Sequence, residues 1–170
     1  IQIGEMLLLS GSFEESEKYY KPSTDQNVNE NTIQYLKSVL FQEDINRSIA
    51  FLDSIILELN PNHRFFNDLL ELHNLLVSNY VDGTKDDQLA FKLFINAEAL
   101  IYQNKTYAAI SNLEKIISQH SDALITPLAT LRLAILLTEL NEFDKAHKFA
   151  LSIQNSDLKD QSLALAGEIN

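Results

Sequence analysis

Apolar residues recur along the chain at helical spacing, in short blocks separated by polar or turn-forming residues. Apolar residues three or four positions apart share one side of an α-helix, so each block predicts an amphipathic helix. Pro22 and Pro61 mark two helix ends, because proline cannot continue a helix, and Asp82-Gly83-Thr84 predicts a turn. The pattern predicts about ten helices, near residues 1–10, 13–21, 31–41, 44–59, 65–79, 86–103, 107–119, 124–140, 142–153 and from 158 onward.

Small and apolar residues in the second half of the chain recur with a fixed period. Ala97 aligns with Ala134 and Ala109 with Ala146, each pair being separated by 37 residues. A fixed period of this length, with small residues at set positions, is typical of stacked helical hairpins. Small side chains let two helices approach closely, and the flanking Leu and Ile residues close over the contact. The expected fold class is therefore all-α, an α-solenoid of stacked antiparallel helix hairpins.

Four segments resemble the turn and second helix of the tetratricopeptide repeat, G-x-Y-x-x-A-x-x-x-Y/L-x-x-I: GSFEESEKYY, EDINRSIAFLDSI, KTYAAISNLEKI and NEFDKAHKFALSI. In four of the repeats the small position of the first helix is filled by Gly4, Ala97, Ala134 and Ala166, whereas Leu36 occupies it in the second repeat. The resemblance implies a right-handed stack of about five hairpins. FNDLLELHNLLVSN and ALIYQNKTYAAISNLEKI are also similar to stretches of large secreted or periplasmic tetratricopeptide proteins of the Bacteroidetes type. That similarity implies a bacterial protein and favours a periplasmic or cell-envelope location over a cytoplasmic one.

We expect one tetratricopeptide-like domain over residues 1–170, with one irregular region. Ser48 and Ala109 are 61 residues apart, about two periods, and each period has two helices. Three helices are nevertheless predicted in this stretch, at 65–79, 86–103 and 107–119, which is an odd number. Either the helix at 86–103 serves two hairpins, or an irregular insert lies near Tyr80–Asp87. The chain opens with Ile1 and ends within an apolar pattern, so we expect a fragment of a longer protein. The expected repeats are 1–28, 29–61, an irregular 62–90, 91–122, 123–156 and a partial 157–170.

Charge and composition exclude several classes of partner and site. The formal net charge is −11, from 24 acidic and 13 basic residues spread along the chain. Such a surface repels phosphate groups, so nucleic acids and anionic membranes are poor candidates. No apolar run approaches the ~20 residues needed to span a bilayer, so no membrane insertion is expected. The absence of cysteine removes disulfides, thiolate metal sites and cysteine nucleophiles.

The sequence holds no recognisable set of catalytic residues. It has no glycine-rich phosphate loop, no G-x-S-x-G and no H-E-x-x-H, and its four histidines lie in separate segments. Asp82, Asp86 and Asp87 lack the alternating oxygen ligands of a calcium loop, so an acidic turn and helix start is favoured. We therefore expect no catalysis, no metal and no cofactor. A helical enzyme stays a minor hypothesis, which an activity lost on replacing one polar residue would revive.

The resemblance also implies a partner site on the concave surface formed by the first helices of the hairpins. Only Lys37 is basic among these positions, so a clamp for a C-terminal carboxylate is not expected. An apolar, aromatic and mildly acidic groove instead suits an amphipathic or basic partner segment. Alternatively, Phe91, Phe94 and Tyr102 pack against neighbouring helices or another part of the full protein. The candidate groove residues are Lys37, Phe41, Phe91, Phe94, Glu98, Tyr102, Leu131 and Thr138, and the same positions in the second repeat include Ile33 and Leu40.

The most specific function consistent with these features is a non-catalytic scaffold or adaptor. It would bind a peptide or a partner helix on the concave surface, and it could also form homo-oligomers. The alternative is a structural spacer or homo-oligomerisation segment of a larger envelope-associated protein. A mass that changes with protein concentration would favour the second hypothesis.

Overall fold

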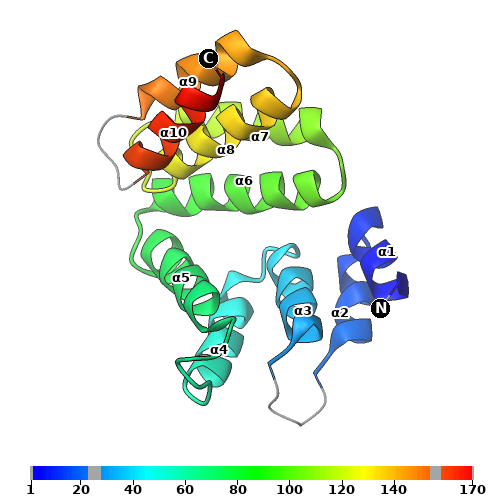
Figure 1. Cartoon of the computed structure of the whole chain (residues 1–170). Helices are drawn as coiled ribbons and strands as arrows, with labels where there is room; N and C mark the ends of the chain where they lie inside the picture. The colour runs from blue at the N-terminus through cyan, green and yellow to red at the C-terminus, as the bar shows by residue number, and fades with distance from the viewer. Residues whose placement is uncertain (1, 23–27, 154–157, 170) are drawn as a thin grey trace. The chain divides into compact units, whose positions relative to one another are not determined.

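The computed structural model of the chain describes residues 2–22, 28–153 and 158–169, over which it forms ten α-helices and one π-helical segment (Figure 1). No strand occurs in these ranges, and the predicted all-α class is confirmed. The elements are α1 (Gln2–Ser10), α2 (Phe13–Tyr20), α3 (Glu30–Leu40), α4 (Ile45–Ile56), α5 (Phe66–Leu76), η1 (Val77–Val81), α6 (Lys85–Tyr102), α7 (Thr106–Gln119), α8 (Thr126–Glu139), α9 (Phe143–Ser152) and α10 (Lys159–Ile169).

The helices form two compact units. The first comprises Ile1–Thr84 together with Tyr102–Asn104, and the second comprises Lys85–Ile101 and Lys105–Asn170. In the first unit each of the helices α1 to α5 packs against the next, and in the second unit the same holds from α7 to α10. These series comprise five helices in the first unit and four in the second, and two kinds of turn recur between the helices in both units.

One kind of turn connects the two helices of each hairpin. A residue with a left-handed backbone follows α1, α3, α6 and α8, and this conformation closes a helix C-terminus. After α8, for example, the Glu142 N–H donates to the Leu137 carbonyl oxygen at 2.8 Å. The turn marks α1, α3, α6 and α8 as the first helices of hairpins, with α2, α4, α7 and α9 as their partners. The residues concerned are Gly11 (φ 84°), Glu43 (φ 59°), Asn104 (φ 58°) and Asn141 (φ 61°).

A second kind of turn leads from one hairpin to the next helix, and it occurs in both units. The His63 N–H donates to the Asn60 carbonyl oxygen at 2.8 Å before α5, and the Ala123 N–H donates to that of His120 at 3.0 Å before α8. Because α8 opens a hairpin, the same turn assigns α5 as a first helix. No α-helix lies between α5 and α6 to complete a hairpin with α5. This missing partner explains why the sequence predicts three helices, an odd number, at 65–79, 86–103 and 107–119. The break in the period falls between Val77 and Thr84, where η1 replaces regular α-helix.

Small residues occur where the helices approach closely, as the sequence predicts. In the second unit Ala134, Ala150 and Ala166 form one buried cluster against which Phe149 and Leu165 pack. In the first unit, the Ser16 hydroxyl donates to the Gly4 carbonyl oxygen at 3.2 Å. The Ser38 hydroxyl donates in turn to Ser16 Oγ at 3.0 Å. These buried polar contacts connect α1, α2 and α3 and satisfy hydroxyl groups that would otherwise be unpaired.

Helix starts follow local chemistry. Asn29 caps α3, its side chain accepting from the Thr32 N–H at 3.4 Å, while the Thr32 hydroxyl accepts from the Asn29 N–H at 3.1 Å. This reciprocal arrangement is a capping box, which stabilises a helix N-terminus. Pro127 lies in the first turn of α8, as predicted, where its missing N–H costs nothing.

Candidate partner-binding groove

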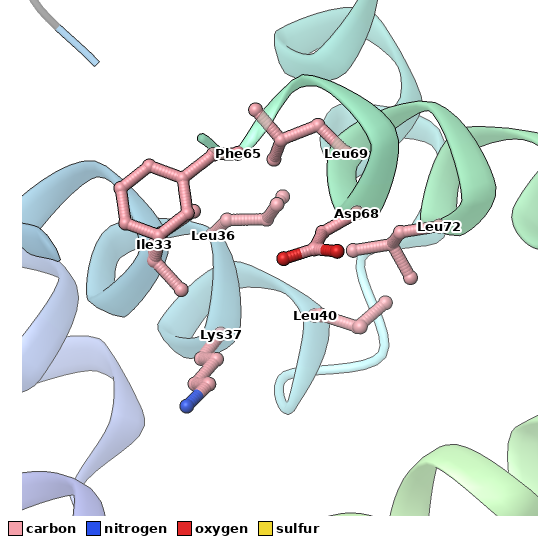
Figure 2. A pocket seen from close by; sticks show the side chains of 8 residues that line it. All are labelled: Ile33, Leu36, Lys37, Leu40, Phe65, Asp68, Leu69 and Leu72. Carbon is pink, nitrogen blue, oxygen red and sulfur yellow. The ribbon is translucent and has the colours of Figure 1, made fainter. Parts of the chain in front are cut away.

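An apolar groove opens between α3 and α5 in the first unit (Figure 2). Its volume is about 170 Å³. The α3 side is lined by Ile33, Leu36, Lys37 and Leu40, and the side formed by α5 and the residue before it is lined by Phe65, Asp68, Leu69 and Leu72.

Helical periodicity places these residues in the groove. On both helices the lining residues recur at three- and four-residue spacing, which keeps them on one face. Leu36 and Leu69, each 2% exposed, form its buried floor. The opposite side of α3 is occupied by Ser38, whose hydroxyl reaches α2. Because α3 packs on α2 through one face, its other apolar face remains available to line the groove.

An ion pair connects the two walls near one end of the groove. Arg64 Nη2 lies 2.8 Å from Glu30 Oε1, joining the start of α3 to the segment that leads into α5. The Arg64 guanidinium also lies over the Phe65 ring, 4.3 Å from its centroid. The pair is well exposed, so it contributes little to the free energy of folding. It nevertheless connects side chains that lie next to lining residues of both walls.

The two charged side chains of the lining lie in different environments. Lys37 Nζ lies 5.1 Å from the centroid of the Tyr102 ring, a distance at which a cation attracts the ring face. Burial is the main cause that raises the pKa of Tyr102 above its usual value, so this ring stays neutral at pH 7. Figure 2 shows the Lys37 amine directed away from Asp68, whose carboxylate points in among the leucines. The groove is thus apolar with one carboxylate in its wall.

Three of the sequence-predicted groove residues come together in the first unit. Lys37 lines the groove, and Phe41 follows one turn later, directly after α3. The Phe41 ring centroid lies 5.9 Å from that of Tyr102, which is grouped with this unit, and 5.4 Å from that of Phe13. Phe41 and Tyr102 are half-buried, and neither lines the groove itself. Lys37, Phe41 and Tyr102 form a contiguous aromatic and cationic cluster.

The other predicted residues belong to α6 and α8 in the second unit and do not line this groove. Phe91, Phe94 and Leu131 are 1%, 7% and 6% exposed. These three side chains are therefore part of the packed interior, in line with the alternative that Phe91 and Phe94 pack against neighbouring helices. The reason is that α6 buries apolar residues on more than one face, including Ile95 and Ala99. The position of a residue in the repeat pattern alone does not determine which apolar face of such a helix remains exposed to solvent.

The two remaining polar candidates already have partners within the second unit. Arg132 donates to Glu98 twice, from Nε to Oε1 at 2.7 Å and from Nη2 to Oε2 at 3.1 Å. This fork joins α6 to α8. The Thr138 hydroxyl donates to the Ala134 carbonyl oxygen within α8 at 2.9 Å. Both residues thus have structural contacts, and a role for them in partner binding stays a prediction.

Sequence reasoning missed the half of the groove that α5 provides. Phe65, Asp68, Leu69 and Leu72 lie in the stretch predicted as irregular, so no repeat position was assigned to them. The feature that identifies these residues as part of a repeat is the turn before α5, because its hydrogen bond matches the one in the turn before α8. That match assigns α5 as a first helix, the kind of helix on which the sequence analysis expected the partner site.

Two acidic residues in the first turn of α6 contact the α7–α8 connection. Asp86 Oδ1 lies 2.7 Å from His120 Nδ1, and Asp87 Oδ1 accepts from the Leu124 N–H at 2.8 Å. Among the described residues no three His, Asp or Glu side chains gather in a way that could hold a metal ion. None of the described helices is long and apolar enough to cross a bilayer.

Comparison with known proteins agrees with this architecture. A family model described as a tetratricopeptide repeat-like domain matches residues 76–170, more than half of the chain. The chain belongs to this family. Its members generally act as scaffolds for protein–protein interaction and are typically non-catalytic. The matched residues include the whole of the second unit, whereas the α3–α5 groove lies in the first, which shares its turns.

One similar protein is the leucine-rich repeat and WD repeat-containing protein 1 of Xenopus laevis. It is 36% identical over 62 residues, which amount to 35% of this chain and 9% of that protein. The chain therefore spans less than a tenth of the length of this relative. No solved structure matches the chain.

Proposed function

We propose that this tetratricopeptide repeat-like chain is a non-catalytic scaffold that binds a partner helix through the α3–α5 groove. The observation that carries the proposal is the open apolar groove between α3 and α5, and the expectation that first helices line a concave partner site supports it. Ile33, Lys37 and Leu40 are among the positions that the repeat pattern selects, and α5 supplies the facing wall.

The size of the groove favours a protein side chain over a cofactor or metabolite. Small-molecule sites usually have volumes of about 300–1,000 Å³. An apolar cavity of about 150 Å³ accepts a benzene molecule, so a groove of about 170 Å³ matches one leucine or phenylalanine side chain. A single anchor residue of an amphipathic partner helix fits these dimensions.

One anchor cannot provide stable binding alone. Burying a leucine-sized side chain contributes about 1.5–3 kcal/mol, less than the ~4 kcal/mol that corresponds to a millimolar Kd. The partner must therefore also contact the surface beside the groove. Lys37, Phe41 and Tyr102 supply such a surface, because their aromatic rings and cation are partly exposed next to the α3 wall.

Selection of peptides on the purified chain tests the proposal. Peptides from a random phage-displayed library would be selected on the wild type and their Kd values compared for Leu72→Glu and Leu70→Glu. Leu72 lines the groove, whereas Leu70 is 37% exposed on the same helix and does not. Both variants gain the same charge on α5, so they differ in position alone, and circular dichroism would check that both fold.

The proposal predicts that Leu72→Glu abolishes binding and that Leu70→Glu leaves it within about twofold. Leu40→Glu, on the opposite wall, should behave like Leu72→Glu. Equal binding by all three folded variants would exclude the groove as the binding site.

A further inference from the structure

The wall of the α3–α5 groove contains one carboxylate without a partner. Asp68 lines the groove, and within the described part of the chain no hydrogen-bond donor or cation contacts it. Figure 2 shows its carboxylate directed in among Leu36, Leu40 and Leu72. Asp68 is exposed, so a cation on a partner docked over the groove can reach its carboxylate.

The two cations that border the groove are already engaged. Lys37 lies against the Tyr102 ring, and Arg64 pairs with Glu30 and covers the Phe65 ring. Neither side chain neutralises Asp68. The next turn of α5 adds Glu71, which is exposed, and the whole chain has a formal net charge of −11. The lining itself carries one cation and one carboxylate, so the negative field at the groove comes from Glu71 and from the net charge of the whole chain, while Asp68 is the charged group of the lining that has no partner among the described residues.

We propose that the partner is a basic amphipathic helix, which places an apolar anchor in the groove and a lysine or arginine against Asp68. This inference rests on the proposed function and names the chemistry of its partner. On a helix, residues three or four positions apart share one face. The cation therefore lies one turn from the anchor, so that both reach the same wall of α5. Charge complementarity of this kind selects among helices with the same apolar face.

Three synthetic helices would serve as probes. Each would have about 20 residues, long enough for stable helicity, with identical leucine anchors. The residues flanking the anchors would be lysine in one peptide, glutamine in the second and glutamate in the third. Kd values would be measured by calorimetry at about 0.15 M salt, where long-range attraction is screened beyond ~8 Å.

The expected order of affinity for the wild type is lysine, then glutamine, then glutamate. The lysine peptide should bind about three- to fivefold more tightly than the glutamine peptide, because a pair with an exposed carboxylate contributes up to about 1 kcal/mol. Asp68→Asn should remove most of this preference while keeping the affinity for the glutamine peptide. Glu71→Gln is the matched control, because it removes the same charge from the same helix but outside the groove, and it should keep the preference.

The possible failures are distinguishable. Equal binding of the lysine and glutamine peptides to the wild type would overturn the basic partner and leave groove binding intact. Equal losses of preference in Asp68→Asn and Glu71→Gln would also overturn it, because the preference would then come from the general acidity of the surface. If Leu72→Glu does not weaken the binding of any of the three peptides, that result contradicts the proposed function itself.

Discussion

Gly4 lies where the buried ring of Tyr20 crosses α1, and replacing it with alanine is predicted to destabilise the first unit. A Cβ atom added at Gly4 would lie 2.5 Å from Tyr20 Cζ and 2.5 Å from Tyr19 Cδ1. Tyr20 is 4% exposed, and its ring meets that of Tyr19 edge to face at 5.2 Å. Carbon atoms in contact are normally about 3.5–4.0 Å apart, so the Tyr20 ring would have to retreat by about 1 Å.

Two opposing terms determine the size of the effect. Alanine is favoured over glycine inside a helix by about 1 kcal/mol. Overpacking a well-packed site costs about 1–3 kcal/mol, and the upper half of that range applies because the neighbouring Tyr20 ring is buried. The expected net effect of Gly4→Ala is a loss of about 1–2 kcal/mol in the free energy of unfolding of the first unit.

Gly167 provides a matched comparison, since nothing lies within 4 Å of a Cβ atom added there. At this position only the higher helix propensity of alanine over glycine applies, and this gain is smaller near the end of α10. Gly167→Ala should therefore stabilise the second unit by about 0.5 kcal/mol. Urea unfolding followed by circular dichroism would give the net changes. Native-state hydrogen exchange of the amides in α1–α3 and in α8–α10 would assign each change to its unit.

The two substitutions, identical in chemistry, are thus predicted to have opposite signs. A Gly4→Ala variant as stable as the wild type would refute the close packing of Tyr20 on α1. In a Tyr20→Leu background the cost of Gly4→Ala should fall, because one of the two clashing rings, the buried one, is removed. An unchanged cost in that background would mean that the loss comes from another contact.

Three further predictions concern single contacts. Glu43 has a left-handed backbone (φ 59°) where the equivalent turns have glycine or asparagine, so Glu43→Gly should stabilise the first unit by about 0.5–1 kcal/mol in urea unfolding; a loss of stability would contradict the strain. Asp87→Ala removes the acceptor of the Leu124 N–H and should lower the stability of the second unit by about 1–3 kcal/mol, with hydrogen exchange in α1–α3 unchanged. Burial is the main cause that raises the pKa values of Tyr20, Tyr35 and Tyr102 above 10.0. Their contribution to stability is therefore fully present below about pH 10 and is lost as the pH rises through the pKa values of the folded state, so Tyr35→Phe should reduce the fall in the urea midpoint between about pH 9 and 11.

The sequence predicted the helical repeat because its evidence is local. Small residues at repeat positions of the sequence pack together, as the Ala134, Ala150 and Ala166 cluster shows. Proline and glycine marked several helix ends, because their backbone restrictions act within one or two residues. The left-handed turn at Glu43 could not be predicted in the same way, because glutamate, unlike glycine or asparagine, is not typical of positions with a positive φ angle.

The groove was only half predicted, because its formation depends on contacts between residues distant in the sequence. Lys37 was assigned through the repeat pattern, but Leu72 lies where the pattern breaks and no register was available. Phe91 and Phe94 were assigned to a groove by the same pattern, and the structure buries both. Periodicity shows which face of a helix is apolar, whereas the packing of neighbouring helices determines which apolar face is covered.

Methyl resonances of the wild type, followed by NMR during titration with a selected peptide, test the central claim most directly. The account predicts that the largest shifts occur at the methyl groups of the groove, those of Ile33, Leu36, Leu40, Leu69 and Leu72. Leu70 and Leu131, which lie outside the groove, should change little. Binding that shifts Leu131 and its neighbours in α8 and leaves the groove methyl groups unchanged would contradict the account.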